Sequence, residues 1–312
     1  MISRRNIRVK VMQTLYTLNT VDGEQKNIDP VKLLQKQLDS TRQLFIYLLY
    51  TITEVARYAE TDSVKRASKH LPNFQDLNVN TKLSGNEFLW KIMENESFVK
   101  ATEVDKPFLI EDTKNQVKKL YNQMIATEEY KSYINLNSRD KKTEKDIIHF
   151  IFTDLMLPGE DYTSHVEEHF TNWDDDAEMM EQLMLNYLQK PGSYNLQEMV
   201  GPEKWMFAKD LLKTSIDKRE YALELIKPKL KNWDADRIAV LDMILMEMGV
   251  CELIFFETIP TKVTINEYID LAKAYSTPQS GQFVNGILDN IHKDLVSQNK
   301  INKVDFKNKA QP

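Results

Sequence analysis

Two stretches in the last third of the chain decide the fold: Pro260-Thr-Lys-Val-Thr-Ile-Asn-Glu-Tyr-Ile-Asp-Leu-Ala-Lys273 and Phe283-Val-Asn-Gly-Ile-Leu-Asp289. Their apolar residues recur at the spacing of amphipathic helices. Thr261 or Thr264 is expected to cap the first helix, and Glu267 is placed for a capping box with Thr264. The two stretches therefore predict a pair of consecutive helices.

The same helical period continues through almost the whole chain, beginning with a stripe in residues 7–18. A stripe from Trp205 to Leu230 predicts one helix, which Pro228 is expected to kink or end because proline has no backbone donor. The run 238–255 leaves little polar surface, which is typical of the central helix of a bundle. Only 8 Gly and 10 Pro occur in 312 residues, which argues against a turn-rich β fold. The sequence predicts an all-α protein.

Charge and cysteine content narrow the functional classes. The net charge of −6 means that any nucleic-acid contact has to come from a local basic patch. Such a patch opens the chain, where Arg4, Arg5, Arg8 and Lys10 precede the first acidic residue. The single Cys251 excludes an intramolecular disulfide and is expected to be a buried apolar residue. No stretch of 18 apolar residues or secretion signal is visible, so we expect a cytoplasmic protein without a membrane span.

The first helix combines cations with an aromatic ring. Arg5, Arg8, Met12 and Tyr16 fall within an arc of roughly 80°, beside the apolar stripe. Guanidinium groups neutralise phosphates and an exposed ring stacks on an unpaired base, so this flank suits single-stranded RNA. The alternative interpretation is a solvated basic end with Tyr16 packed in the core.

These segments resemble the NusB family. The stretch 283–289 is similar to the family signature FVNGVLD, with Ile287 as the one change. Residues 1–20 and 204–297 carry the resemblance. Further similarities are Ile259–Glu267 to IPxKVAINE, Tyr268–Lys273 to AIELAK, Leu241–Phe255 to LRxALYEL, and Arg4-Arg5, Arg8 and Leu15-Tyr16 to the opening RRxAR and ALY.

The resemblance implies a fold and a function. Family members are all-α bundles of two helical subdomains that bind the boxA element of ribosomal RNA leader transcripts together with the ribosomal protein NusE. We therefore expect a non-enzymatic, RNA-binding transcription antitermination factor that joins an RNA polymerase antitermination complex and needs no cofactor or metal. The residues expected at boxA-type single-stranded RNA are Arg4, Arg5, Arg8, Tyr16, Ser280, Phe283 and Asn285.

Alternatives remain at some of these positions. Phe283 either stacks on a base or packs under the first helix, and Asn285 either meets RNA or serves its own helix. Gln282 departs from the family, which often has a basic residue there. This departure removes one phosphate partner.

The resemblance divides the chain into four parts. These are the first helix of the NusB-like core (1–22), a helical insertion (23–202), the remaining core (203–298) and a basic tail (299–312), which is expected to be solvated. Helices in the insertion are expected near 31–68, 86–99, 107–134, 140–155 and 174–189. Two pairs of segments have similar sequences: 172–185 with 232–245, and 48–59 with 211–222. They suggest that the insertion is a degenerate copy of core helices, with chance similarity as the alternative.

Two rival functions come from other classes. The chain is a protein-interaction scaffold if the NusB-like fold persists without specific RNA binding. His165-Val-Glu-Glu-His169 matches the H-x-x-E-H spacing of a zinc hydrolase, although Val166 and Phe170 suggest the buried side of an ordinary helix. The glycines of the sequence are isolated from one another, so no glycine-rich nucleotide-binding loop is visible in it.

Overall fold

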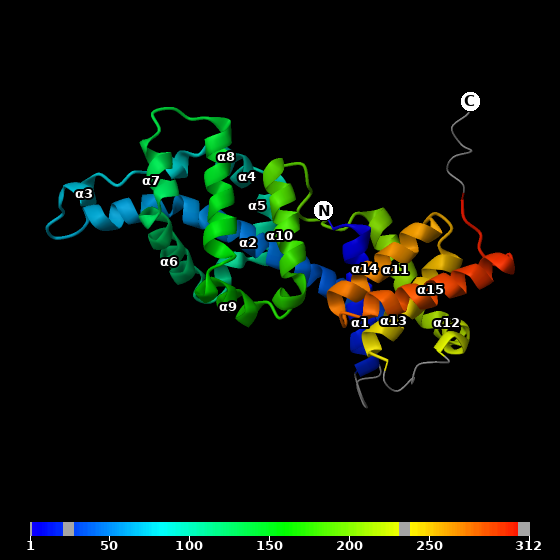
Figure 1. The fold of residues 1–312 in the computed structure, drawn as a ribbon. Coiled ribbons are helices and arrows are strands. Elements are labelled where there is room, and N and C mark those ends of the chain that lie inside the picture. Colours follow the sequence, from blue (N-terminus) through cyan, green and yellow to red (C-terminus); the bar gives the residue numbers. More distant parts are fainter. Residues whose placement is uncertain (1, 21–27, 231–237, 305–312) are drawn as a thin grey trace, which may run out of the picture. The chain divides into compact units, whose positions relative to one another are not determined.

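The computed structural model describes residues 2–20, 28–230 and 238–304. Every regular element in these ranges is a helix, so the all-α prediction is confirmed (Figure 1). The chain divides into two compact units: residues 39–199, and Ile2–Leu38 with Val200–Pro312. Helix α2 (Pro30–Ala67) begins in the second of these and ends in the first. No described helix is long and apolar enough to cross a membrane.

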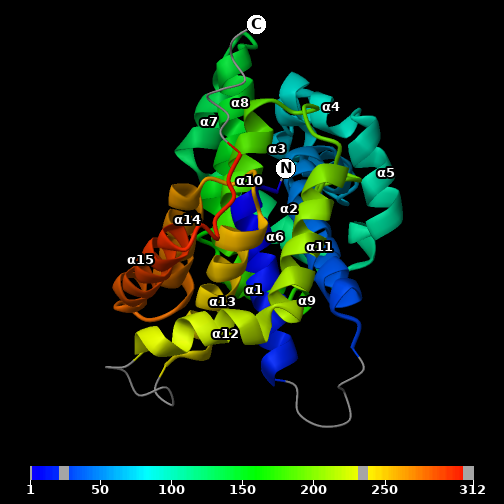
Figure 2. The same cartoon turned by 90° about the vertical axis from the view of Figure 1, so that its right-hand side faces the viewer.

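The unit of residues 2–38 and 200–312 is built around helix α13. All residues from Ile244 to Leu253 are buried, as expected for a helix that is apolar on nearly every side. Helices α1, α11, α12, α14 and α15 pack around it (Figures 1 and 2). The bounds are α1 (Arg4–Thr20), α11 (Pro202–Asp217), α12 (Arg219–Ile226), η5 (Lys227–Leu230), α13 (Val240–Phe255), α14 (Thr261–Tyr275) and α15 (Ser280–Ser297).

Two local predictions in this unit are wrong. The stripe 205–230 is not one helix, because the backbone leaves the helical region at Lys218 (φ −106°, ψ 12°) and α12 begins after it. Pro228 lies in the 3₁₀ turn η5 beyond the end of α12, in agreement with its expected role. Neither Thr261 nor Thr264 caps α14, because the N-cap is Pro260 and the Thr264 hydroxyl is buried in a tertiary contact.

The unit of residues 39–199 is built around α2. Residues 44–49 of this helix are all buried, so this stretch is covered on every side. The other elements are α3 (Phe74–Leu77), η2 (Lys82–Gly85), α4 (Glu87–Met93), α5 (Glu96–Asp105), η3 (Pro107–Leu109), α6 (Thr113–Ala126), α7 (Glu128–Asn135), α8 (Lys141–Phe150), the π-helix η4 (Ile151–Met156), α9 (Glu160–His169) and α10 (Trp173–Gln189).

The predicted helices 86–99 and 107–134 are each interrupted. Asn95 caps α5 by accepting a hydrogen bond from the Ser97 amide at 2.9 Å. Thr127 similarly caps α7 through the Tyr130 amide at 3.3 Å. An N-cap residue leaves the helical conformation, so each of these side chains begins a new helix instead of continuing the old one.

Candidate RNA interface

Helix α1 starts at a local cap and presents two exposed cations. The Asn6 amide donates to Ser3 Oγ at 3.1 Å, and the Ile7 amide donates to the Ser3 carbonyl at 3.0 Å. Arg4 and Arg5 follow on the surface, with side chains 42% and 44% exposed. Both guanidinium groups are therefore accessible to an anion from solvent.

Each exposed arginine has an acidic neighbour. The Arg4 guanidinium lies 2.8 Å from a carboxylate oxygen of Glu203 on α11, and that of Arg5 lies 3.6 Å from Asp270 on α14. Exposed ion pairs of this kind contribute only about 0–1 kcal/mol. Phosphate oxygens can therefore replace either carboxylate at small cost.

Arg8 does not reach the surface. It is only 2% exposed, and its Nε and a terminal nitrogen each donate to a Glu252 carboxylate oxygen at 2.8 Å. Its guanidinium also lies 5.4 Å from the centre of the Phe207 ring. The placement of Arg8 on the outer face of α1 is thus corrected: a buried carboxylate on α13 draws this side chain inward.

Glu252 links three helices of the bundle, α1, α13 and α14. Besides Arg8, its carboxylate accepts hydrogen bonds from Thr264 Oγ1 at 2.9 Å and from the Tyr268 hydroxyl at 3.2 Å. Burial alone lowers the pKa of Arg8, but the hydrogen bond and negative charge of Glu252 outweigh it, so that the pKa is raised overall. Arg8 stays charged, and the network fixes α1 against α13 and α14.

Ser280 is likewise buried, with 1% of its surface exposed. Its hydroxyl donates to Asp242 Oδ2 at 2.7 Å, and it accepts a hydrogen bond from the Thr277 amide at 3.2 Å. Both partners hold the start of α15 against α13 and the preceding turn. The expectation that Ser280 meets RNA directly is therefore replaced by a positioning role.

Contacts through α14 connect the first turn of α1 to the first turn of α15. Asp270 lies near Arg5 and also 3.8 Å from Lys273 Nζ. The aliphatic stem of Lys273 crosses Gly281 so closely that a Cβ there would lie 2.6 Å from Lys273 Cγ. Arg5, Asp270, Lys273 and Gly281 thus form a continuous series, and Phe283 follows two residues later.

The aromatic and amide residues flank this series. Tyr16 is 42% exposed and lies eleven residues after Arg5, which places it on the same side of α1 about 16 Å further along. Phe283 is half-buried, whereas Asn285 is exposed one turn into α15. We name the surface of Arg4, Arg5, Tyr16, Lys273, Phe283 and Asn285 the α1–α15 face.

Three residues that shape this surface were not identified from the sequence: the exposed Asp270 and Lys273, and the buried Glu252 beneath it. Asp270 and Lys273 stand three residues apart on an amphipathic helix, so their shared exposure was a readable signal. Glu252 carried no such signal, because it lies in an apolar run and its role depends on contacts with α1 and α14. A tertiary ion pair of this type becomes visible only in the fold.

Other candidate chemistry is weaker. Within the described ranges, no group of three or more His, Cys, Asp or Glu side chains is arranged to hold a metal ion. His165 is instead buried and hydrogen-bonded to the Tyr47 hydroxyl at 2.6 Å. Cys251 is buried as predicted, and burial raises its pKa to about 12.

The fold and the α1–α15 face define a class: an all-α bundle that presents cations and aromatic rings from its first and last helices. The NusB family profile matches residues 166–293. The transcription antitermination protein NusB of Bacillus licheniformis is 39% identical over 95 residues, which are 30% of this chain and 74% of the relative. The chain belongs to the NusB family.

Two further relatives bear the same name. The transcription antitermination protein NusB of Salinibacter ruber is 44% identical over 97 residues, 31% of this chain and 61% of the relative. That of Methylacidiphilum infernorum is 43% identical over 83 residues, 27% of this chain and 58% of the relative. The chain thus spans about three fifths of these two proteins. No solved structure matches the chain.

The family match begins upstream of residue 203, within the segment that the sequence assigned to an insertion. It includes α10, which the contacts group with residues 39–199. The division into residues 1–22, 23–202, 203–298 and 299–312 stays a prediction. Of the basic tail, residues 305–312 lie outside the described residues, but Lys303 donates to the carbonyls of Glu252 and Phe256 at 3.0 and 2.8 Å.

Proposed function

We propose that this chain is an RNA-binding transcription antitermination factor that grips single-stranded RNA with the α1–α15 face. The observation that carries the proposal is the series Arg5, Asp270, Lys273 and Gly281, which joins the first turns of two helices distant in sequence. Membership of the NusB family and the similarity to proteins named transcription antitermination protein NusB support the same function.

The residues expected at the RNA have two roles, according to whether their side chains are exposed or buried. Arg4, Arg5 and Lys273 neutralise phosphates, while Tyr16 and Phe283 offer ring faces to unpaired bases. Asn285 supplies an exposed amide for a base edge or a sugar. Arg8 and Ser280 act from beneath, by fixing α1 and the start of α15 on α13.

We further propose that the RNA is a boxA-type leader element and that NusE binds beside it. The complex then joins RNA polymerase in the cytoplasm and keeps ribosomal RNA transcription from terminating early. These partners follow from the resemblance of residues 283–289 and 259–273 to the family segments. The chain's own chemistry in this scheme is binding, without a cofactor.

Fluorescence anisotropy with boxA RNA and a scrambled RNA of equal composition tests the RNA step. The full chain should prefer boxA, and Arg5→Glu with Lys273→Glu should weaken binding at least tenfold. Lys213→Glu is the matched control, since Lys213 is an exposed lysine on α11 that belongs to no part of the α1–α15 face. Equal affinity of the double variant and the full chain for boxA would contradict the proposal.

The scaffold function is distinguished by measuring how much NusE the chain retains with and without boxA RNA. The pairing of Arg4 and Arg5 with Glu203 and Asp270 partly neutralises the face, which is the observation that favours a scaffold. A scaffold binds NusE or other proteins with no response to added boxA RNA. The RNA-binding proposal instead requires that boxA RNA increase the amount of NusE retained by the full chain.

A further inference from the structure

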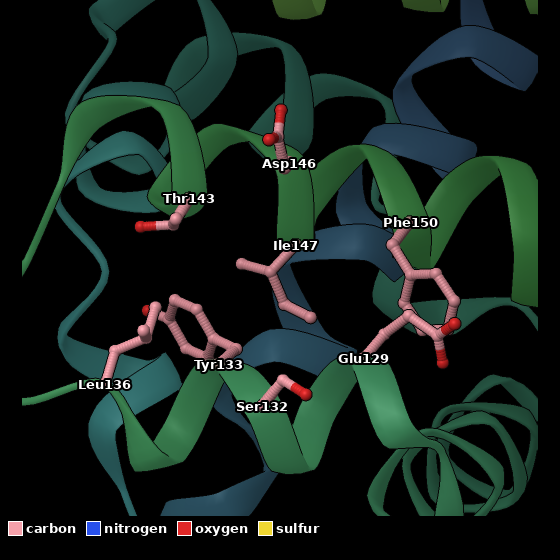
Figure 3. A pocket seen from close by; sticks show the side chains of 8 residues that line it. All are labelled: Glu129, Ser132, Tyr133, Leu136, Thr143, Asp146, Ile147 and Phe150. Atoms are coloured by element: carbon pink, nitrogen blue, oxygen red, sulfur yellow. The ribbon is translucent and has the colours of Figure 1, made fainter.

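A concave surface lies in the unit of residues 39–199, between α7 and α8. It has a volume of about 240 Å³, and the residues that line it are Glu129, Ser132, Tyr133, Leu136, Thr143, Asp146, Ile147 and Phe150. Figure 3 shows Ile147 and Phe150 of α8 directed toward the side of α7 that carries Ser132 and Tyr133. We name this surface the α7–α8 groove.

The floor of the groove is held in place by buried hydrogen bonds. The Tyr133 hydroxyl donates to Glu144 Oε1 at 2.8 Å, which fastens α7 to α8. Lys82 Nζ donates to the Tyr133 carbonyl at 2.8 Å and lies 4.9 Å from the centre of its ring. Because these contacts fix the walls without an occupant, a ligand would not have to order them on binding.

Size and lining favour a partner's side chains as occupant. Sites that bury a drug-sized molecule usually measure roughly 300–1,000 Å³, so this groove suits one or two large apolar side chains. Leu136 is 42% exposed at its edge, and the side chains of Ile147 and Phe150 are its apolar wall on α8. A π-helix, Ile151–Met156, follows Phe150 directly, and such segments recur at functional sites.

The charge of the lining specifies the partner further. Glu129 on α7 and Asp146 on α8 are exposed carboxylates, and the lining contains no lysine or arginine. Neither carboxylate has an ion-pair partner among the residues described. By contrast, Glu128 beside Glu129 is paired with Lys131 at 2.8 Å and does not line the groove.

We propose that the α7–α8 groove docks a basic segment of a partner protein, with one or two apolar side chains inserted between α7 and α8 and flanking lysine or arginine residues at Glu129 and Asp146. An apolar anchor with adjacent cations complements both the walls and the unpaired carboxylates. This site uses residues of the unit 39–199 alone and is independent of the proposed RNA binding.

Selection from a random 12-residue peptide library displayed on phage tests the proposal with the full chain as bait. Enriched peptides should contain a large apolar residue flanked by lysine or arginine. Synthetic copies should lose at least tenfold in affinity toward Glu129→Lys with Asp146→Lys. Glu128→Lys, the matched control, should bind them within twofold of the unaltered chain.

A second variant removes space and leaves charge unchanged. Ser132 is exposed and lines the groove, so Ser132→Phe should fill it and abolish peptide binding while circular dichroism stays unaltered. Failure to enrich any peptide, or enrichment of acidic peptides, would overturn the proposal. So would peptide binding that neither variant weakens, or self-association of the full chain that both variants abolish, because a second copy would then be the occupant.

Discussion

Arg8 and Glu252 show how a charged pair is kept inside an apolar bundle. Desolvating either ion is costly, but Glu252 accepts from Arg8, Thr264 and Tyr268, so its oxygens are well satisfied. Arg8 lies in addition over the Phe207 and Tyr268 rings, at 5.4 and 6.0 Å from their centres. The pair therefore sets how α1 lies on α13 and α14.

Glu252→Gln should strongly destabilise the chain. The substitution removes the carboxylate that the buried Arg8 contacts most closely and leaves only that of Glu267, at 3.5 Å, as counterion. Breaking a buried pair costs about 3–5 kcal/mol. Urea unfolding followed by circular dichroism measures the loss. Glu203→Gln, which removes only the exposed partner of Arg4, should cost no more than about 1 kcal/mol; equal losses would contradict the assigned role.

Asp270→Asn should strengthen RNA binding. Asp270 lies near both Arg5 and Lys273, so its removal frees two cations of the α1–α15 face. An exposed pair of this kind is worth about 0.2–1 kcal/mol, which corresponds to a gain of up to about fivefold in affinity at low salt. Anisotropy with boxA RNA measures it, and weaker binding by the variant would show that the face does not meet phosphate.

At the scale of elements, α2 packs on α9 through a cluster of rings. The Tyr47 ring centre lies 5.3 Å from that of Phe170, and the Tyr47 hydroxyl bonds His165. The centre of the His165 ring is 4.6 Å from that of His169. Burial, and next the charge of His169, lower the pKa of His165 from its ordinary value of 6.5.

This histidine makes stability depend on pH. As pH falls through about 6.5, the unfolded chain protonates His165 while the folded chain resists, so the free energy of unfolding decreases. For one histidine, the free energy of unfolding changes with pH by at most about 1.4 kcal/mol per pH unit. His165→Gln keeps a hydrogen-bonding group for Tyr47 and should flatten the pH dependence of amide exchange in α2.

The control is the exposed His70, whose change to glutamine should leave the pH dependence of exchange as in the unaltered chain. His149 adds to the acid sensitivity, because burial lowers its pKa as well. The intrinsic rate of amide exchange itself falls between pH 7 and pH 5. If amide exchange in α2 slowed by more than this intrinsic change, the result would contradict this account.

The helical spacing of apolar residues predicted the helices well where apolar packing alone determines them. The run 238–255 was expected at the centre of a bundle, and Ile244 to Leu253 of α13 are indeed buried throughout. Breaks at Asn95, Thr127 and Lys218 were missed, because apolar periodicity continues across them while a single cap or dihedral ends the helix. Helix α9 was not among the predicted helix ranges, although Val166 and Phe170 were interpreted as the buried side of an ordinary helix there.

The site was predicted less completely than the fold. The sequence identified Arg4, Arg5 and Tyr16 as cations and a ring on one helix, and all three are exposed. It could not foresee that Arg8 turns inward, because the attracting carboxylate of Glu252 is 244 residues away in sequence. Long-range pairs of this kind are set by the fold and leave no local pattern.

At the scale of the whole molecule, the net charge of −6 predicts weak non-specific binding to nucleic acid. In the proposed RNA complex, the cations of the α1–α15 face that would contact phosphates are the exposed Arg4, Arg5 and Lys273. The log–log slope of boxA affinity against salt should therefore be about −2, from about −0.7 for each phosphate of a single strand. A slope steeper than about −5 would require cations outside this face.

Photo-crosslinking tests the central claim most directly. BoxA RNA with 4-thiouridine at successive positions is irradiated with the full chain, and the attached residues are identified by mass spectrometry. We predict crosslinks to peptides that contain Tyr16 on α1 and Lys273 to Asn285 at the junction of α14 and α15. Crosslinks confined to residues 39–199, or equal crosslinking of scrambled RNA, would contradict the account.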